Sequence, residues 1–299
     1  MTNAAPTSAL PDVSEQRHVR LAAAKRWPMP DLREIWHYRE LLATLAGRDL
    51  KLRYKQTALG LIWAVFPPLV AAAIFTYIRG FLQLETPGNA PSILFVLAGF
   101  VGFTVFRDTL DRSGQSLLTN QHLVSKIYFP RLLLPLAATL SVLFDHAIML
   151  GLVAVVWMAC GLIFASNPDV LTPVPGLHLL MWPVVTLLSV MLASGFGMVV
   201  AALSSHFRDF KHVVPVALQL LLYASPVFYD LSLPLSRDDG WVILLNPLSG
   251  LIAAYRWSLT GIGMVHWPAF AASAAVAIVV FVVGSILFRR VEGRLADVI

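Results

Sequence analysis

The chain has 299 residues, of which 58% are hydrophobic and only 13% charged, and its mean hydropathy is +0.73. Soluble domains are about a quarter charged and avoid exposing so much apolar surface. This composition therefore excludes soluble enzymes, soluble nucleic-acid-binding proteins and disordered chains. The formal net charge is +5, so the question becomes where the cations lie relative to a bilayer. The single cysteine, Cys160, excludes an intrachain disulfide framework.

Two segments precede the first long apolar run. Residues 1–30 contain several prolines and basic residues and are expected to form a mobile cytoplasmic tail. Residues 31–55 are predicted to form an amphipathic helix, broken near Gly47. The apolar residues that recur at helical spacing along it are Leu32, Ile35, Trp36, Leu42, Leu45 and Ala46. Such a helix lies at the cytoplasmic headgroup level or packs on a partner protein, and the pattern leaves both alternatives open.

The rest of the chain, residues 56–299, is predicted to be the membrane domain, because a transmembrane helix needs roughly 20 mostly apolar residues. Six segments qualify as spans: 57–81, 92–106, 132–164, 177–203, 213–228 and 268–288. The second and fifth are short as apolar runs and are expected to extend into polar flanks. The predicted fold class is an all-α membrane protein with six transmembrane helices.

The positions of Lys and Arg set the orientation, because these residues are in excess in cytoplasmic loops. Nineteen of the 22 lie before the first span, after the second or fourth span, or in the C-terminal tail. Only Arg79, Arg237 and Arg256 lie on the other side. Both termini are therefore predicted to be cytoplasmic. The basic character is explained by topology, so no nucleic-acid partner is expected.

The loop between the fifth and sixth spans, residues 229–267, is too apolar for a free loop and too interrupted for a simple span. We interpret it as two short helices that dip back into the outer leaflet. Non-helical backbone at that depth must be buried in protein or line a cavity.

Motifs for nucleotide or metal chemistry are missing from the sequence. No Gly-Lys dipeptide occurs, so the phosphate-binding P-loop is impossible and any ATP would bind to another chain. We expect no cofactor and no metal in this chain.

Four charged residues at the exit of the second span suggest a helix that extends beyond the membrane. Arg107 with Asp111, and Asp108 with Arg112, are predicted to form ion pairs one helical turn apart. The polar segment that follows, residues 116–131, has a short apolar face that suits either a plain connector or a partner contact.

Asp145 and His146 lie within the third apolar run and are functional candidates, because charged groups inside a span rarely lack a role. We expect a structural role, as a hydrogen-bonded pair or a position near the cytoplasmic surface. An intramembrane transferase that uses both groups is a remote alternative.

Five segments, taken together, resemble the permease subunit of type-2 ABC exporters of polysaccharides, the group that exports O-antigen, teichoic acid and related lipid-linked glycans. They are RDLKLRYKQTALG from Arg48, SKIYFPRLLLPL from Ser125, RDFKHVVPVALQLLLYASPVFY from Arg208, NPLSGLIAAYR from Asn246 and FRRVEGRLADVI from Phe288. Their order and spacing agree with six spans and two cytoplasmic ends. The second span departs from the pattern, since Arg107 and Asp108 stand where aromatic or small residues are expected.

The resemblance implies a homodimer of permeases in the bacterial inner membrane, joined to two copies of a separate ATPase that binds ATP and Mg. The implied substrate is a lipid-linked polysaccharide, such as an O-antigen-like glycan on a polyprenyl pyrophosphate. An exporter of a drug or small lipid has the same topology and remains the alternative.

The resemblance also implies roles for particular residues. The segment 31–55 becomes a cytoplasmic interface helix whose headgroup contacts are Arg48, Lys51, Arg53, Tyr54 and Lys55. The implied coupling helix, which would contact the ATPase, contains Leu117, Leu118, Asn120, His122, Leu123 and Lys126. The implied periplasmic gate contains Tyr229, Trp241, Asn246, Pro247, Tyr255 and Arg256. Candidate channel aromatics are Trp63, Phe66, Tyr223 and Phe228.

Overall fold

The computed structural model describes residues 32–55, 62–124, 129–167, 170, 176–204, 207 and 209–295. The expected N-terminal tail lies outside these residues. The described part of the chain is helical and contains no strand. Its elements are α1 (Leu32–His37), α2 (Arg39–Tyr54), α3 (Ile62–Phe81), η1 (Pro87–Asn89), α4 (Ser92–Thr119), α5 (Gln121–Val124), α6 (Leu133–Ile163), η2 (Leu177–Met181), α7 (Trp182–Ser204), α8 (Phe210–Tyr223), α9 (Ser232–Leu235), η3 (Gly240–Leu245), α10 (Pro247–Thr260) and α11 (Trp267–Leu295).

Five helices of the described chain, α3, α4, α6, α7 and α11, are long and apolar enough to cross a membrane. Each coincides with a predicted span, and α4 continues unbroken through the predicted polar extension to Thr119. The fifth predicted span, 213–228, differs. It corresponds to α8, whose 14 residues cover only about 21 Å of a hydrocarbon core roughly 30 Å thick. Beyond Tyr223 the chain leaves the helix and continues as turns.

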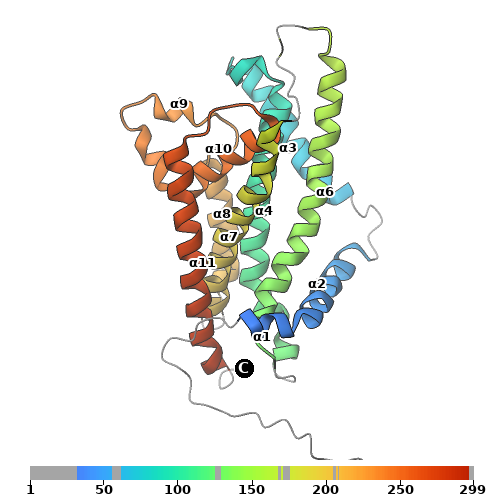
Figure 1. The fold of residues 1–299 in the computed structure, drawn as a ribbon, viewed down its shortest axis with the longest axis vertical. Coiled ribbons are helices and arrows are strands. Elements are labelled where there is room, and N and C mark those ends of the chain that lie inside the picture. Colours follow the sequence, from blue (N-terminus) through green and yellow to red (C-terminus); the bar gives the residue numbers. More distant parts are fainter. Residues whose placement is uncertain are drawn as a thin grey trace, which may run out of the picture.

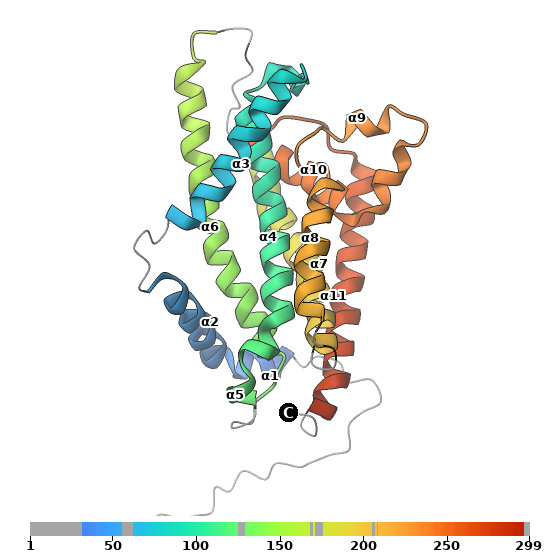
Figure 2. The ribbon, with the colours of Figure 1, turned by 180° about the vertical axis from the view of Figure 1, so that it is seen from behind.

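The long helices form one bundle with α4 at its centre (Figures 1 and 2). Helix α4 packs on α3, α6, α7, α8 and α10, and most of its first half is buried. Helices α1, α2 and α5 lie at one end of the bundle together with the last turns of α11, and we call this the α2 end (Figure 2). Helices α9 and α10 lie at the opposite end, which we call the α10 end.

The contact between α7 and α11 is a backbone-to-backbone contact. A Cβ atom added at Gly284 would lie 2.3 Å from the carbonyl oxygen of Gly195, and one added at Gly195 would lie 2.6 Å from that of Val280. Small residues at helix crossings in membranes allow such close approach, which gains van der Waals contact where no hydrophobic effect drives association. No larger residue fits at either glycine without moving a helix.

The segment before the first span is helical as predicted, but the position of the break was wrong. The chain breaks at Tyr38, between α1 and α2, whereas Gly47 lies inside α2. Glycine costs about 1 kcal/mol in a helix. The burial of Leu45 and Ala46 in a core cluster shared with α6 offsets this cost. The expected apolar face is incomplete, because Trp36 is exposed.

The start of α10 explains the Asn-Pro pair noted in the sequence. The Oδ1 atom of Asn246 accepts a hydrogen bond from the backbone N–H of Leu248 at 3.0 Å, and Pro247 occupies the first helical position. This is the preferred chemistry of a helix N-terminus. The helix ends at Gly261, where φ is +66°, a conformation that glycine adopts without strain.

Candidate functional site

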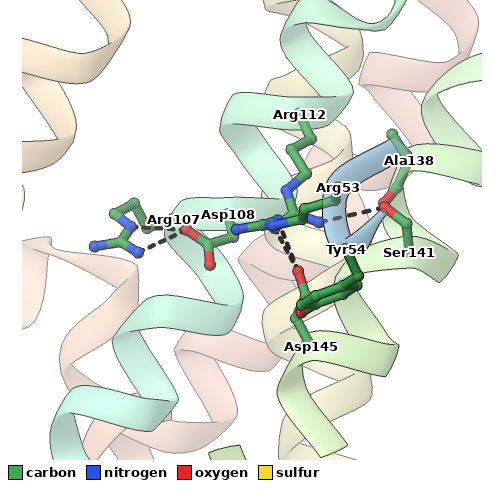
Figure 3. A network of polar contacts seen from close by, with 8 residues as sticks. All are labelled: Arg53, Tyr54, Arg107, Asp108, Arg112, Ala138, Ser141 and Asp145. Atoms are coloured by element: carbon green, nitrogen blue, oxygen red, sulfur yellow. Dashed lines mark hydrogen bonds and ion pairs between the residues drawn. The ribbon is translucent and has the colours of Figure 1, made fainter. Parts of the chain in front are cut away.

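A buried carboxylate, Asp145 of α6, lies where α2, α4 and α6 meet, and it is only 5% exposed. Its Oδ2 atom accepts from Arg53 Nη1 of α2 at 2.7 Å and from Arg112 Nη2 of α4 at 2.5 Å. Its Oδ1 atom accepts from the hydroxyl of Tyr54. The side chains converge on the carboxylate from three helices (Figure 3). We call Arg53, Tyr54, Arg112, Ser141 and Asp145 the Asp145 cluster.

The Asp145 cluster satisfies most of its own polar groups. Arg112 also donates to Ser141 Oγ at 3.4 Å, and Ser141 donates to the Ala138 carbonyl at 2.7 Å. The pKa of Tyr54 is raised to about 12, mainly by burial and to a smaller extent by the hydrogen bond to Asp145. This hydroxyl is therefore a neutral donor at physiological pH. A buried carboxylate without partners costs several kcal/mol. The carboxylate therefore holds α2 against α4 and α6.

A cavity of about 380 Å³ opens beside this cluster. Its lining carries both signs of charge, with Arg53 and Arg112 as the cations and Asp49 and Asp111 as the carboxylates. The remaining lining residues are Leu52, Gln115, Ser116, Thr119, Asn120, Ala138 and Ser141. The cavity thus lies between α2, which is the predicted interface helix, and α4, which is the span in which Arg107 and Asp108 depart from the family pattern.

The ion pairs predicted within the second span were wrong. Arg107 pairs with its neighbour Asp108 at 2.8 Å, and Asp111 accepts from Gln115 Nε2 at 2.6 Å. Arg112 reaches across to Asp145. A carboxylate buried on a neighbouring helix has little water to compete for the guanidinium, so it attracts Arg112 more strongly than a side chain one turn away.

Asp145 and His146 do not form a pair, because adjacent residues on a helix point about 100° apart. The Nε2 atom of His146 lies 2.8 Å from the hydroxyl of Tyr255 on α10. That hydroxyl also accepts from Trp182 Nε1 at 3.0 Å. The two residues serve different helix contacts, which agrees with a structural role. The geometry that a transferase would need, with both groups facing one substrate, does not occur.

A second polar arrangement lies at the α10 end, where the backbone leaves α8. Residues 224–229 are turns, so several of their carbonyl groups lack helical partners. Arg256 of α10 supplies donors to three of them: Nη2 lies 2.6 Å from the Pro226 oxygen and 2.8 Å from the Val227 oxygen, and Nη1 lies 3.3 Å from the Tyr229 oxygen. The side chain of Arg256 is buried.

Arg79, the other buried arginine of this end, completes the arrangement. Its Nη1 atom donates to the Phe228 carbonyl at 2.7 Å, and Nη2 donates to the Glu85 carbonyl at 3.0 Å. Both guanidiniums lie over the ring of Phe95, at 4.8 Å for Arg79 and 3.8 Å for Arg256, which is a favourable cation–π contact. Irregular backbone inside the bundle is thereby satisfied by two fixed cations.

The family profile of the ABC-2 type transporter matches residues 40–260, which is most of the chain. This protein is a member of the ABC-2 type transporter family. The match includes the Asp145 cluster and both buried arginines, and it confirms the resemblance at the level of the family.

Two curated relatives of this ABC-2 protein match nearly end to end, and a third matches over a shorter stretch. The O-antigen export system permease protein RfbA of Myxococcus xanthus is 26% identical over 267 residues, covering 89% of this chain and 98% of that protein. The protein of the same name from Klebsiella pneumoniae is 24% identical over 265 residues, covering 87% and 95%. The polysialic acid transport protein KpsM of Escherichia coli is 26% identical over 212 residues, covering 70% and 77%.

The residues of the predicted coupling helix fall into two groups in this ABC-2 protein. Leu117 and Asn120 are buried. The Oδ1 atom of Asn120 accepts from Arg48 Nη2 at 2.5 Å, and its Nδ2 atom donates to the Ser116 carbonyl at 2.9 Å. These residues therefore connect α4 to α2 and do not offer themselves to a partner.

The other predicted coupling residues lie closer to the surface. His122 is exposed on α5, and Leu118 and Leu123 are half-buried. Helix α5 has only four residues, Gln121–Val124, and Lys126 lies outside the described residues. Among the described residues of α5, Gln121 and His122 are the exposed ones that a partner could contact.

The predicted headgroup contacts of the ABC-2 permease are also divided. Arg48 pairs with Asp49 at 2.8 Å, and Arg53 and Tyr54 belong to the Asp145 cluster. Lys51 and Lys55 are exposed at the end of α2. Two of the four cations are therefore already matched by carboxylates of the same chain.

The predicted gate and channel residues occupy varied environments. Trp241 is exposed, Tyr229 is half-buried and Tyr255 is fully buried. Among the candidate channel aromatics, Phe66 and Tyr223 are exposed. Phe228 is buried and stacks on Phe75 with ring centroids 3.4 Å apart, so its ring is part of the core. The side chain of Trp63 lies outside the described part.

Sequence reasoning missed the roles of Arg112 and Arg79. Arg112 was expected to pair within its own helix, and Arg79 was used only to assign topology. One signal was available for Arg112, because an ionisable residue in an apolar helix usually has a partner on a neighbouring helix. For Arg79 the partners are backbone carbonyls of a turn, which no side-chain pattern reveals.

Proposed function

We propose that this chain is the channel-forming permease subunit of an ABC transporter that exports lipid-linked polysaccharide across the bacterial inner membrane. The observation that supports this best is the near end-to-end match to two O-antigen export permeases. A match to a polysialic acid transport protein widens the class to polysaccharides in general.

The proposed assembly is a homodimer of this chain with two copies of a separate ATPase, which bind ATP and Mg. The sequence has no P-loop of its own. The α2 end is cytoplasmic in this proposal, because the segments rich in Lys and Arg lead to or include the elements gathered there (Figure 2). The α10 end is then periplasmic, with α9, η3 and α10 as the gate.

Coupling in the proposed transporter runs through the α2 end. The ATPase contacts α5 and the interface helices, and the Asp145 cluster joins α2 to α4 and α6. ATP acts by favouring one of two states of the permease, so the coupling elements must move with the spans. Helix α2 is expected to move with α4 and α6, because the Asp145 cluster joins the three helices.

Lys51 and Lys55 are the proposed contacts for the pyrophosphate headgroup of the lipid carrier. They are exposed at the end of α2, where anionic groups of lipids or of the carrier are attracted. The competing explanation is lipid anchoring alone. Changing Lys51→Glu together with Lys55→Glu tests this without disturbing Asp145. Unchanged export in the double variant, with normal membrane insertion, would refute the headgroup role.

The proposed function is tested by deleting the gene and complementing it. We expect loss of the surface polysaccharide and accumulation of a lipid-linked glycan on the cytoplasmic face, both reversed by the intact gene. Surface polysaccharide that remains normal after deletion would contradict the proposal and favour an exporter of a drug or small lipid.

A further inference from the structure

A second cavity, of about 290 Å³, lies between α4 and α8, and it shares Asp111 with the cavity beside the Asp145 cluster. On α4 its lining residues recur at helical spacing. The complete lining is Phe103, Arg107, Asp108, Asp111, Pro215, Leu218, Gln219 and Leu222. Figure 3 shows Arg107 directed away from Asp145, with Asp108 between them. We call this cavity the α4–α8 pocket.

The polar groups of the α4–α8 pocket lie inside the apolar part of the bundle. Gly197 of α7 packs directly on Leu110 and Ser113 of α4, and the apolar run of α7 continues for six more residues to Leu203. Arg107 lies three residues before Leu110 on α4, farther from the α2 end. At 1.5 Å per residue, it is therefore about 13 Å along the helix axis from the level of Leu203. By the same measure Gln219 lies about 13 Å along α8 from Phe210.

These groups are not sealed within the protomer. The side chains of Arg107 and Asp108 are 42% and 24% exposed, and Gln219 is exposed. At this depth an ionised side chain facing lipid costs several kcal/mol, so such groups face the bundle interior or a water-filled cavity. Since the pocket opens outward between α4 and α8, this face of the protomer borders water and not lipid.

The charge of the pocket limits what it can bind. The Arg107 guanidinium is matched by Asp108 at 2.8 Å, and Asp111 adds a second carboxylate, so there is no excess of positive charge. Carboxylates and the Gln219 amide accept hydrogen bonds from hydroxyl groups, and Arg107 and Gln219 donate them. Such a set suits the hydroxyl groups of an uncharged sugar and repels a polyanion.

We infer that the α4–α8 pocket lines the translocation path and binds sugar units of an uncharged polysaccharide. This inference rests on the proposed function and names the site and the charge class of the substrate. A lipid-facing or purely structural role would leave the pocket without access to water.

The inference is tested with single cysteines in a Cys160→Ser background, in membrane vesicles that contain the whole transporter. The probes are two membrane-impermeant methanethiosulfonates, one carrying trimethylammonium and one carrying sulfonate. We expect Gln219→Cys to react with both and Val279→Cys, exposed on the apolar α11, to react with neither. Leu222→Cys serves as a second pocket position if Gln219→Cys does not assemble.

The rate ratio of the cationic to the anionic reagent reports the charge of the pocket. Relative to a free thiol in water, we expect it to favour the cation at Gln219→Cys. Adding Asp111→Asn should reduce this preference by about seven-fold, because one charge about 7 Å away in water changes the rate of each reagent by about three-fold, in opposite directions. Pocket cysteines as unreactive as Val279→Cys, or a preference for the anion, would overturn the inference.

The chemical composition of the glycan trapped by gene deletion provides the second readout. An uncharged repeating unit is expected, and a polyanionic one overturns the assignment of charge class. If no glycan accumulates, the proposed function fails, whereas the cysteine reactivities still decide whether the pocket borders water. The two failures are therefore distinguishable.

Discussion

Arg53 of α2 and Asp145 of α6, which are 92 residues apart in the sequence, form an ion pair with an Nη1–Oδ2 distance of 2.7 Å. Arg112 of α4 shares the same carboxylate oxygen. A single buried carboxylate thus connects the proposed interface helix with two spans. Removing it should affect both the stability of the fold and the transmission of motion from the proposed partner ATPase.

Asp145→Asn should destabilise the permease by about 3 kcal/mol. This is the lower end of the range for breaking a buried ion pair, because Arg53 can turn toward water once the carboxylate is gone. The matched control is Asp239→Asn, which removes a carboxylate from an exposed pair with Arg237. That change should cost about 0–1 kcal/mol. Unfolding in mixed detergent micelles measures both free energies. Equal losses in the two variants would show that the cluster does not fasten α2.

Tyr54 predicts a pH dependence that starts well above neutrality. Its pKa is raised to about 12 by burial and by the hydrogen bond to Asp145, against about 10 in the unfolded chain. The neutral phenol is therefore favoured by folding, and this stability is fully present below pH 10 and lost as the pH rises toward 12. Thermal unfolding between pH 8 and pH 11 should show the loss above pH 10 in wild type and a smaller one in Tyr54→Phe. Identical pH profiles for the two proteins would contradict this assignment.

The helical fold could be predicted from the sequence because each span is a long apolar run, and Lys and Arg lie between the runs. Contacts between helices could not. Arg112 has Asp108 one turn away in its own helix, yet it pairs with Asp145, because burial on α6 makes that carboxylate the stronger partner. The short length of α8 was not predicted, although Pro226 signals a helix end, because the predicted span 213–228 followed composition through Ser225 and Pro226, where the backbone forms turns.

Arg256→Met should destabilise the α10 end more than any exposed arginine change. The side chain donates to three carbonyls of the turns after α8, and methionine leaves them without a donor. Each lost charged hydrogen bond is worth roughly 1.5–3 kcal/mol. Limited proteolysis of residues 224–245 should accelerate in Arg256→Met and remain at the wild-type rate in Arg237→Met. Cleavage at wild-type rates in both variants would argue against the role of Arg256.

Substitutions on the α5 turn should separate the permease from the proposed partner ATPase. Gln121→Glu with His122→Glu places two carboxylates on the exposed surface of α5, so co-purification of the ATPase should fall at least several-fold while membrane insertion stays normal. Arg237→Glu, exposed at the opposite end, is the control. If both variants retain the ATPase equally, the coupling surface lies elsewhere.

The most direct measurement of the proposed export is ATP-driven movement of lipid-linked glycan in inverted membrane vesicles, scored by its protection from periodate added outside. We expect protected glycan to appear only when ATP, the partner ATPase and this chain are all present. It should be absent from vesicles that lack this chain. Equal protection in vesicles with and without the chain would contradict its assignment as the permease of a polysaccharide exporter.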